Sequence, residues 1–121
     1  MTTIDRNPSP SNDDMEVFLE AAKFELPQGF IDFYKEANGA IIITDDEYIV
    51  LWPLTDLFKL NADYNVAMYA PEFFIFGSDG GDTAYAIKKD TGYIFEIPFI
   101  GMSMEESIFR SKNLNGFIKF M

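Results

Sequence analysis

The feature that most constrains this chain is the segment Phe73–Ile87, in which two apolar, aromatic-rich runs flank a short loop of Gly, Ser and Asp. This pattern predicts two antiparallel strands joined by a tight turn. Gly80 and Gly81 can adopt a positive φ without steric cost, and the side chains of Ser78 and Asp79 can bond to nearby backbone groups. Because both runs are apolar, we expect this hairpin at the middle of a sheet.

The length of the chain, 121 residues, is that of one domain, and 48% of its residues are hydrophobic. A chain of this size buries roughly 65% of the surface that it exposes when unfolded, so it can build a core without disulfides or metals. The first residues are polar and rich in Pro, Ser and Asn. We therefore predict a flexible leader over residues 1–12 and a single folded domain over residues 13–121.

The formal net charge is −11, from 20 acidic and 9 basic residues. This charge repels phosphate, so it argues against direct binding of DNA, RNA or anionic lipid and allows a basic partner. An acidic surface also serves simply to keep a small protein in solution. The chain has no Cys and no His, which excludes Ser-His-Asp and Cys-His catalysis and disfavours zinc. We expect no cofactor and, with no apolar run of membrane-spanning length, a cytoplasmic protein.

Three helices are predicted in the first half of the chain. The first begins near Asn12 or Asp13, either of which could cap it, and carries one apolar stripe. The second occupies residues 27–39, with Pro in its first turn, aromatic residues on one face and Asn-Gly at its end. The third is a short helix over residues 54–61, for which Thr55 could supply the cap.

Strand signals lie on both sides of the third helix. β-Branched residues over 40–44 and an apolar run over 48–52 predict a hairpin. Residues 62–72 are weakly patterned and are predicted to form a surface connection. The central hairpin of Phe73–Ile87 follows, and alternating aromatic and aliphatic residues over 93–99 predict a further strand. These last three strands would form a meander.

The end of the chain allows two interpretations. The motif Ser103-Met104-Glu105-Glu106 fits a capping box and favours a helix, whereas residues 107–111 could equally form an edge strand. Residues 113–121 predict a terminal helix capped by Asn113. The predicted fold class is α+β, with two N-terminal helices packed on a mainly antiparallel sheet of about five to six strands and a short C-terminal helix. We expect the helix-facing side of the sheet to carry the Phe and Tyr residues.

Five loop carboxylates are the candidate binding residues: Asp45, Asp46 and Glu47 in the first hairpin turn, and Asp79 and Asp82 in the second. One interpretation is that they are ordinary solvated turn residues. The functional interpretation is that they bind Lys or Arg on a partner, or replace nucleic-acid phosphates in a basic site. A calcium loop is a weaker hypothesis, because Asp79 and Asp82 offer two carboxylates where about five protein oxygen ligands are needed.

Three segments, taken in order, resemble parts of one known family. Residues 26–39 show a Leu-Pro start, an aromatic helix and an Asn-Gly end, residues 76–86 read FGSDGGDTAYA, and residues 97–100 read IPFI. Together they resemble the SMI1/KNR4 (SUKH) superfamily, with Asp82 standing where the family has a third Gly. That family usually closes with a strand and then a helix, which favours a strand over 107–111.

The resemblance implies a non-enzymatic binding protein. Bacterial members are similar to immunity proteins, which neutralise a toxin that is often a nuclease, and eukaryotic relatives resemble regulatory scaffolds for cell-wall synthesis. A single domain of this length favours the bacterial type, with a basic cognate toxin as partner. The alternative is a regulatory or scaffold module that binds a peptide or small ligand in an apolar pocket beside Gly77–Asp82. An exposed sheet edge would also allow a homodimer.

Overall fold

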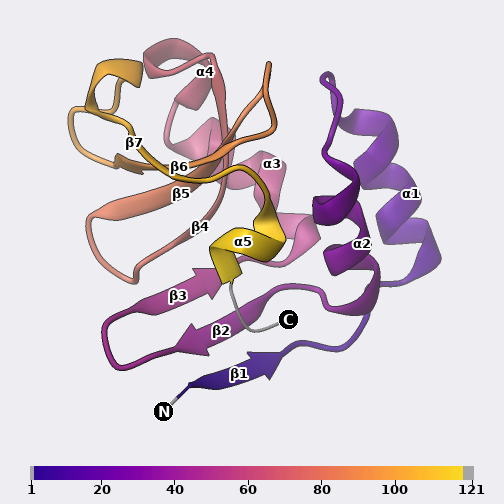
Figure 1. Ribbon diagram of the computed structural model, residues 1–121. Coiled ribbons are helices and arrows are strands. Elements are labelled where there is room, and N and C mark those ends of the chain that lie inside the picture. Colours follow the sequence, from indigo (N-terminus) through magenta and orange to yellow (C-terminus); the bar gives the residue numbers. More distant parts are fainter. Residues whose placement is uncertain (1, 119–121) are drawn as a thin grey trace.

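Seven antiparallel strands form one sheet and follow one another in sequence order from edge to edge (Figure 1). The computed structural model describes residues 2–118. The strands are β1 (Thr3–Arg6), β2 (Ala40–Ile43), β3 (Tyr48–Leu51), β4 (Phe73–Ser78), β5 (Thr83–Lys88), β6 (Ile94–Pro98) and β7 (Ile108–Ser111). The helices are α1 (Asn12–Ala21), α2 (Gln28–Glu36), α3 (Leu54–Asp63), α4 (Val66–Tyr69) and α5 (Leu114–Ile118). The predicted α+β class is confirmed, with more strands than expected.

The additional strand, β1, comes from the segment that we predicted to be a flexible leader. Thr3–Arg6 pairs antiparallel with β2 and forms one edge of the sheet. The backbone N–H of Asn7 donates to the carbonyl of Gly39 at 3.1 Å, and the Ser9 hydroxyl donates to the carbonyl of Glu36 at 2.9 Å. For these residues the prediction of a loose leader was wrong. The reason is that a four-residue strand with one aliphatic side chain, Ile4, carries no alternating pattern.

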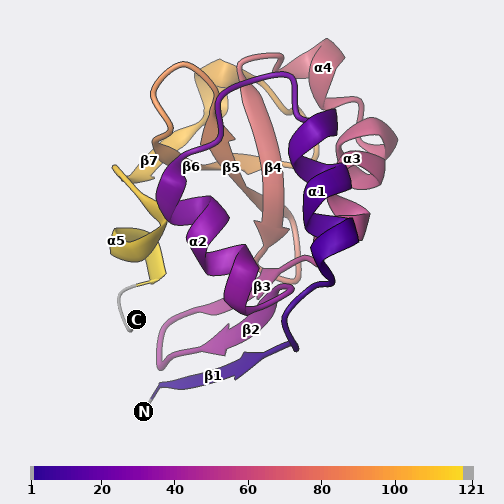
Figure 2. The same ribbon diagram turned by 90° about the vertical axis from the view of Figure 1, so that its right-hand side faces the viewer.

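The central hairpin is confirmed, and both faces of its first strand are buried. All six residues of β4 are buried, and β4 lies fourth in the order of seven strands. Phe74 and Phe76 pack in the larger core with α1 and α2, which cross this face of the sheet in Figure 2. Phe73 belongs instead to a second core on the other face, beneath α4, where its ring lies 5.3 Å from that of Phe95. The aromatic residues are therefore divided between the two faces, not gathered on one.

Two helix caps differ from those predicted. The hydroxyl of Ser11 accepts a hydrogen bond from the N–H of Asp14 at 3.0 Å, so Ser11 caps α1 in place of either neighbour that we expected. No side chain of α3 caps that helix, and Thr55 has no such role. Instead the side chain of Asn38, two residues beyond α2, accepts from the N–H of Leu54 at 2.7 Å. This hydrogen bond joins the two helices.

Both interpretations of the end of the chain prove partly right. Met104–Glu106 forms one 3₁₀ turn, in which the Ser103 hydroxyl accepts from the N–H of Glu106 at 3.3 Å, and the strand β7 follows. The predicted cap of the last helix is confirmed, because the side chain of Asn113 accepts from the N–H of Gly116 at 2.7 Å. Residues 119–121 of that predicted helix lie outside the described residues.

Candidate functional site

The two turns that carry the candidate carboxylates lie at the same end of the sheet, on the left in Figure 1. They come together because β3 pairs antiparallel with β4, which places the β2–β3 turn beside the β4–β5 turn. Between them lies a cavity of about 300 Å³, which we call the acidic recess. Its lining comes from both turns and from β3, β5, β6 and β7, and consists of Asp46, Glu47, Tyr48, Asp79, Thr83, Tyr85, Glu96 and Arg110.

Side chains within the turns fix the two rims of the acidic recess. In the β4–β5 turn, the Asp79 carboxylate accepts from the N–H groups of Gly81 at 2.8 Å and Thr83 at 3.2 Å, and the Ser78 hydroxyl accepts from Gly80 at 3.1 Å. Gly80 has a φ of +82°, which an L side chain rarely adopts. The predicted turn chemistry is therefore confirmed, and one Asp79 oxygen has a structural role.

The other rim is held in a similar way. The Thr44 hydroxyl accepts from the N–H groups of Asp46 at 3.2 Å and Glu47 at 2.9 Å. These bonds leave the Asp46 side chain exposed at the mouth of the acidic recess and the Glu47 side chain half-buried inside it.

Arg110 lies at the floor of the acidic recess and joins three parts of the sheet. Its guanidinium donates to Glu96 on β6 at 2.8 Å and to Glu47 in the β2–β3 turn. It also lies over the rings of Tyr85, at 5.6 Å, and Phe117, at 5.2 Å, which stabilise a cation through their negative faces. With its side chain 19% exposed, Arg110 holds the two glutamates in place from below.

The surroundings fix the ionisation of the two groups at this floor. Burial by itself lowers the pKa of Arg110, but the hydrogen bonds to Glu96 and Glu47 outweigh it, so the pKa is raised. Burial also raises the pKa of the Tyr85 phenol, although Arg110 acts in the opposite direction. Four carboxylates and one guanidinium give the lining a formal charge of −3. This negative charge would attract cationic donors such as Lys or Arg.

Three of the four carboxylates in the acidic recess already accept hydrogen bonds from protein groups. Glu47 and Glu96 each place an oxygen on Arg110, and Asp79 places one on the turn backbone. Across residues 2–118, no group of three or more carboxylates is arranged so that it could hold a metal ion. Direct ion pairing with a partner therefore suits this geometry better than a calcium site.

The structure brings together part of the predicted set and adds to it. Asp46, Glu47 and Asp79 line the acidic recess, whereas Asp45 and Asp82 lie on the same two turns with exposed side chains and do not line it. Glu96 and Arg110 also line it and were not predicted. Glu96 is a charged residue within an apolar strand segment, and Arg110 directly follows Ile108 and Phe109, so these contrasts are the signal that could have revealed them.

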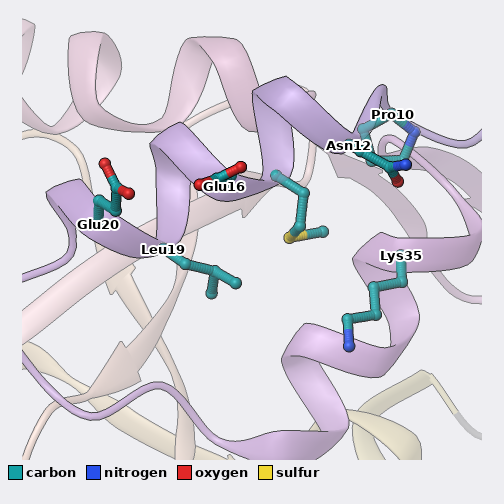
Figure 3. A pocket seen from close by; sticks show the side chains of 7 residues that line it. Pro10, Asn12, Glu16, Leu19, Glu20 and Lys35 are labelled. Carbon is teal, nitrogen blue, oxygen red and sulfur yellow. The ribbon is translucent and has the colours of Figure 1, made fainter.

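A larger cavity, of about 490 Å³, lies between α1 and α2 (Figure 3). In this view Leu19 of α1 and Lys35 of α2 point into the gap, while Glu16 and Glu20 lie along α1. Its lining contains both acidic and basic residues, so its charge indicates a class of ligand less clearly than the charge of the acidic recess does. The alternative function required an apolar pocket beside Gly77–Asp82, but the cavity found there is charged.

The family model adds an independent comparison. The model of the SMI1/KNR4 family (SUKH-1) matches residues 9–119, which include every helix and the strands β2 to β7. The chain belongs to this family. A search of curated proteins finds no match to this SUKH-1 chain. In the part of it that the structure describes, no helix has the length and apolar character needed to cross a bilayer.

Proposed function

We propose that this SUKH-1 protein is a cytoplasmic, non-enzymatic immunity protein that binds and neutralises a basic toxin domain such as a nuclease. The observation that carries the proposal is the acidic recess: two turns distant in sequence meet there around carboxylates that outnumber their one cationic partner. Membership of the SMI1/KNR4 family supports a binding role of this kind. The net charge of −11 supports a basic partner and argues against direct contact with nucleic acid.

Binding would begin by electrostatic attraction and end in ion pairing. The exposed Asp45, Asp46 and Asp82 attract a basic surface, which raises the association rate at low ionic strength. A Lys or Arg of the toxin then enters the acidic recess and donates to the outer oxygens of Glu47 and Asp79. Because Arg110 fixes Glu47 from below, little side-chain entropy is lost when the cation binds. In a nuclease, the residues bound in this way would be those that contact phosphate.

The direct test is co-expression with a toxin domain encoded beside this gene. The wild-type protein should restore growth and co-purify with the toxin. The double variant Asp46→Lys with Asp82→Lys should weaken binding by at least a hundredfold and abolish protection, because it places one cation at the mouth of the acidic recess and one on the exposed turn beside it. Raising the salt concentration should weaken wild-type binding for the same electrostatic reason.

The matched control carries the same change in charge elsewhere. Glu36→Lys with Glu72→Lys reverses two exposed carboxylates that lie outside the acidic recess, and it should keep nearly wild-type binding and protection. Equal loss in both double variants would show an unspecific charge effect and contradict the proposed site. Absence of binding to any neighbouring toxin would contradict the immunity function itself.

The predicted homodimer is a separate proposal. Among the described strands, β1 and β7 each have one unpaired edge, and β7 exposes Ile108 and Phe109. Such edges can pair with a second copy. Sedimentation at several protein concentrations tests this, and Ile108→Lys should shift any dimer that uses β7 to the monomer.

A further inference from the structure

A second, aromatic cavity lies among α1, α3, α4 and β4, and shares no lining residue with the acidic recess. Its volume is about 300 Å³. Its lining consists of Ala21, Lys23, Phe24, Phe58, Asn61, Ala62, Val66, Ala67, Phe73, Phe74 and Lys89. We call it the aromatic cavity. Small molecules bind in sites of about 300 to 1,000 Å³, so its size allows a small ligand.

The aromatic cavity exists because small side chains lie opposite large ones. Three helices each contribute an alanine, and these face large rings from α3 and β4. The rings of Phe58 and Phe74 lie 5.6 Å apart, and Phe24 lies 5.3 Å from Phe74. Phe58 remains 36% exposed, although covering it would be favourable. The small residues thus leave an aromatic surface open to an apolar group.

The polar groups of the aromatic cavity are cationic. Lys23 and Lys89 line it together with no carboxylate, and the ammonium of Lys89 lies 5.6 Å above the Phe24 ring. Among the described residues neither lysine forms an ion pair, although carboxylates outnumber basic groups by 20 to 9 in the chain. The nearby Lys88, in contrast, pairs with Asp90. Two unpaired cations beside an open aromatic surface favour an anion with an apolar body.

We propose that the aromatic cavity binds a small amphipathic carboxylate, with its apolar body on Phe58 and Phe74 and its carboxylate on Lys23 and Lys89. Apolar burial would supply most of the affinity, and the two ammonium groups would supply the selectivity for an anion. The amide of Asn61 takes no part, because it already bonds to the backbone of Leu57 and Ile75. The site is independent of toxin binding, since it is built from other residues.

The test is an NMR titration of the ¹⁵N-labelled protein with octanoate, below its micelle concentration, in parallel with octan-1-ol and octylamine. Octanoate should shift the amides of α3, α4 and β4 around the aromatic cavity and bind at least tenfold more tightly than either comparison compound. Equal binding of all three compounds would contradict the role of the lysines. Shifts confined to the cavity between α1 and α2, or no saturable shift, would contradict the site.

Two variants separate the charge from the cavity. Lys23→Gln with Lys89→Gln should weaken octanoate binding about tenfold and leave the binding of octan-1-ol unchanged. The control variant, Lys59→Gln with Lys112→Gln, makes the same change in net charge outside the cavity and should not alter the binding of either compound. Ala67→Leu, at an exposed helix position, narrows the cavity and should weaken all binding. Unchanged octanoate affinity in the Lys23 and Lys89 variant, with its spectrum still that of a folded protein, would overturn the proposal.

Discussion

Asn61 of α3 bonds to both backbone groups of Ile75 in β4: its side-chain oxygen accepts from the N–H at 2.9 Å, and its side-chain nitrogen donates to the carbonyl at 2.9 Å. Ile75 lies beyond the last residue pair of β3 and β4, Leu51 with Gly77. Asn61 therefore takes the place that a strand residue would have occupied. It joins α3 to the sheet at the point where the register of β4 and β5 shifts.

Replacement of Asn61 by Ala should lower the free energy of unfolding by about 2 to 4 kcal/mol, because two backbone groups of a fully buried residue lose their partner. Urea denaturation measures this change. Lys59→Ala, on the same helix, removes only an exposed ion pair with Asp63 and should leave the free energy of unfolding almost unchanged. Similar losses in the two variants would show that the Asn61 amide does not support β4.

Substitution by Ala should change the free energy of unfolding in opposite directions at Gly39 and Gly29. Gly39 has a φ of +88°, and a Cβ there would collide with the backbone oxygen of Leu51, so Gly39→Ala should lower the free energy of unfolding by about 2 to 4 kcal/mol. A Cβ at Gly29, in α2, meets nothing within 4 Å, so Gly29→Ala should raise it by about 0.5 to 1 kcal/mol. Thermal and urea unfolding of the pair tests the close approach of β3 to the end of α2; a tolerated Ala at residue 39 would contradict it.

The sequence was sufficient where neighbouring residues determine the structure. The hairpin of Phe73–Ile87 could be predicted because its turn residues and its apolar runs are contiguous, and each acts within a few positions. The Asn113 cap could be predicted for the same reason. β1 could not, since Thr3–Arg6 becomes a strand by pairing with β2, and its own residues carry no pattern. The cap of α3 escaped prediction because Asn38, which supplies it, is 16 residues away.

The residues of the candidate site also fall into those that could be predicted from the sequence and those that could not. Its turn carboxylates could be predicted from loop position and charge, and three of them line the acidic recess. The partners of Arg110 could not, because Glu47 is 63 residues and Glu96 is 14 residues away along the chain. Only the order of the strands brings these side chains together. The residues that fix the geometry of the site were thus less visible in the sequence than the residues at its mouth.

Tyr34 should make the protein sensitive to alkaline pH. Its ring is fully buried, its hydroxyl donates to the carbonyl of Trp52 at 2.8 Å, and burial raises the pKa of the phenol far above its usual value. Because the pKa of Tyr34 is higher in the folded state, the neutral phenol makes its full contribution to stability below the pKa of tyrosine in the unfolded chain, about 10. That contribution is lost as the pH rises above this value. The wild-type protein should therefore lose stability above about pH 10.

Tyr34→Phe should be less stable than the wild type by about 1 to 2 kcal/mol at pH 7, because the carbonyl of Trp52 loses its donor. Above about pH 10 the unfolded wild type gains stability because its Tyr34 ionises, whereas the unfolded variant cannot gain it in this way. The difference in unfolding free energy should therefore narrow, by up to about 1.4 kcal/mol per pH unit. Urea unfolding at pH 7 and pH 11 measures the change, with the exposed Tyr69→Phe as control for loss of one hydroxyl. A difference that stays constant or grows would refute the argument.

Arg110→Gln should leave Glu47 and Glu96 close together without a cation between them. Because the Arg110 side chain is 19% exposed, the expected loss lies between that of a surface and a buried ion pair, at about 1 to 3 kcal/mol of unfolding free energy. Adding Glu96→Gln should restore part of the loss by removing one like charge, and 1 M NaCl should do the same by screening. Urea unfolding of the single and double variants at low and high salt tests this. If the double variant is less stable than Arg110→Gln, the glutamates are not held together by Arg110, and the floor of the acidic recess has another origin.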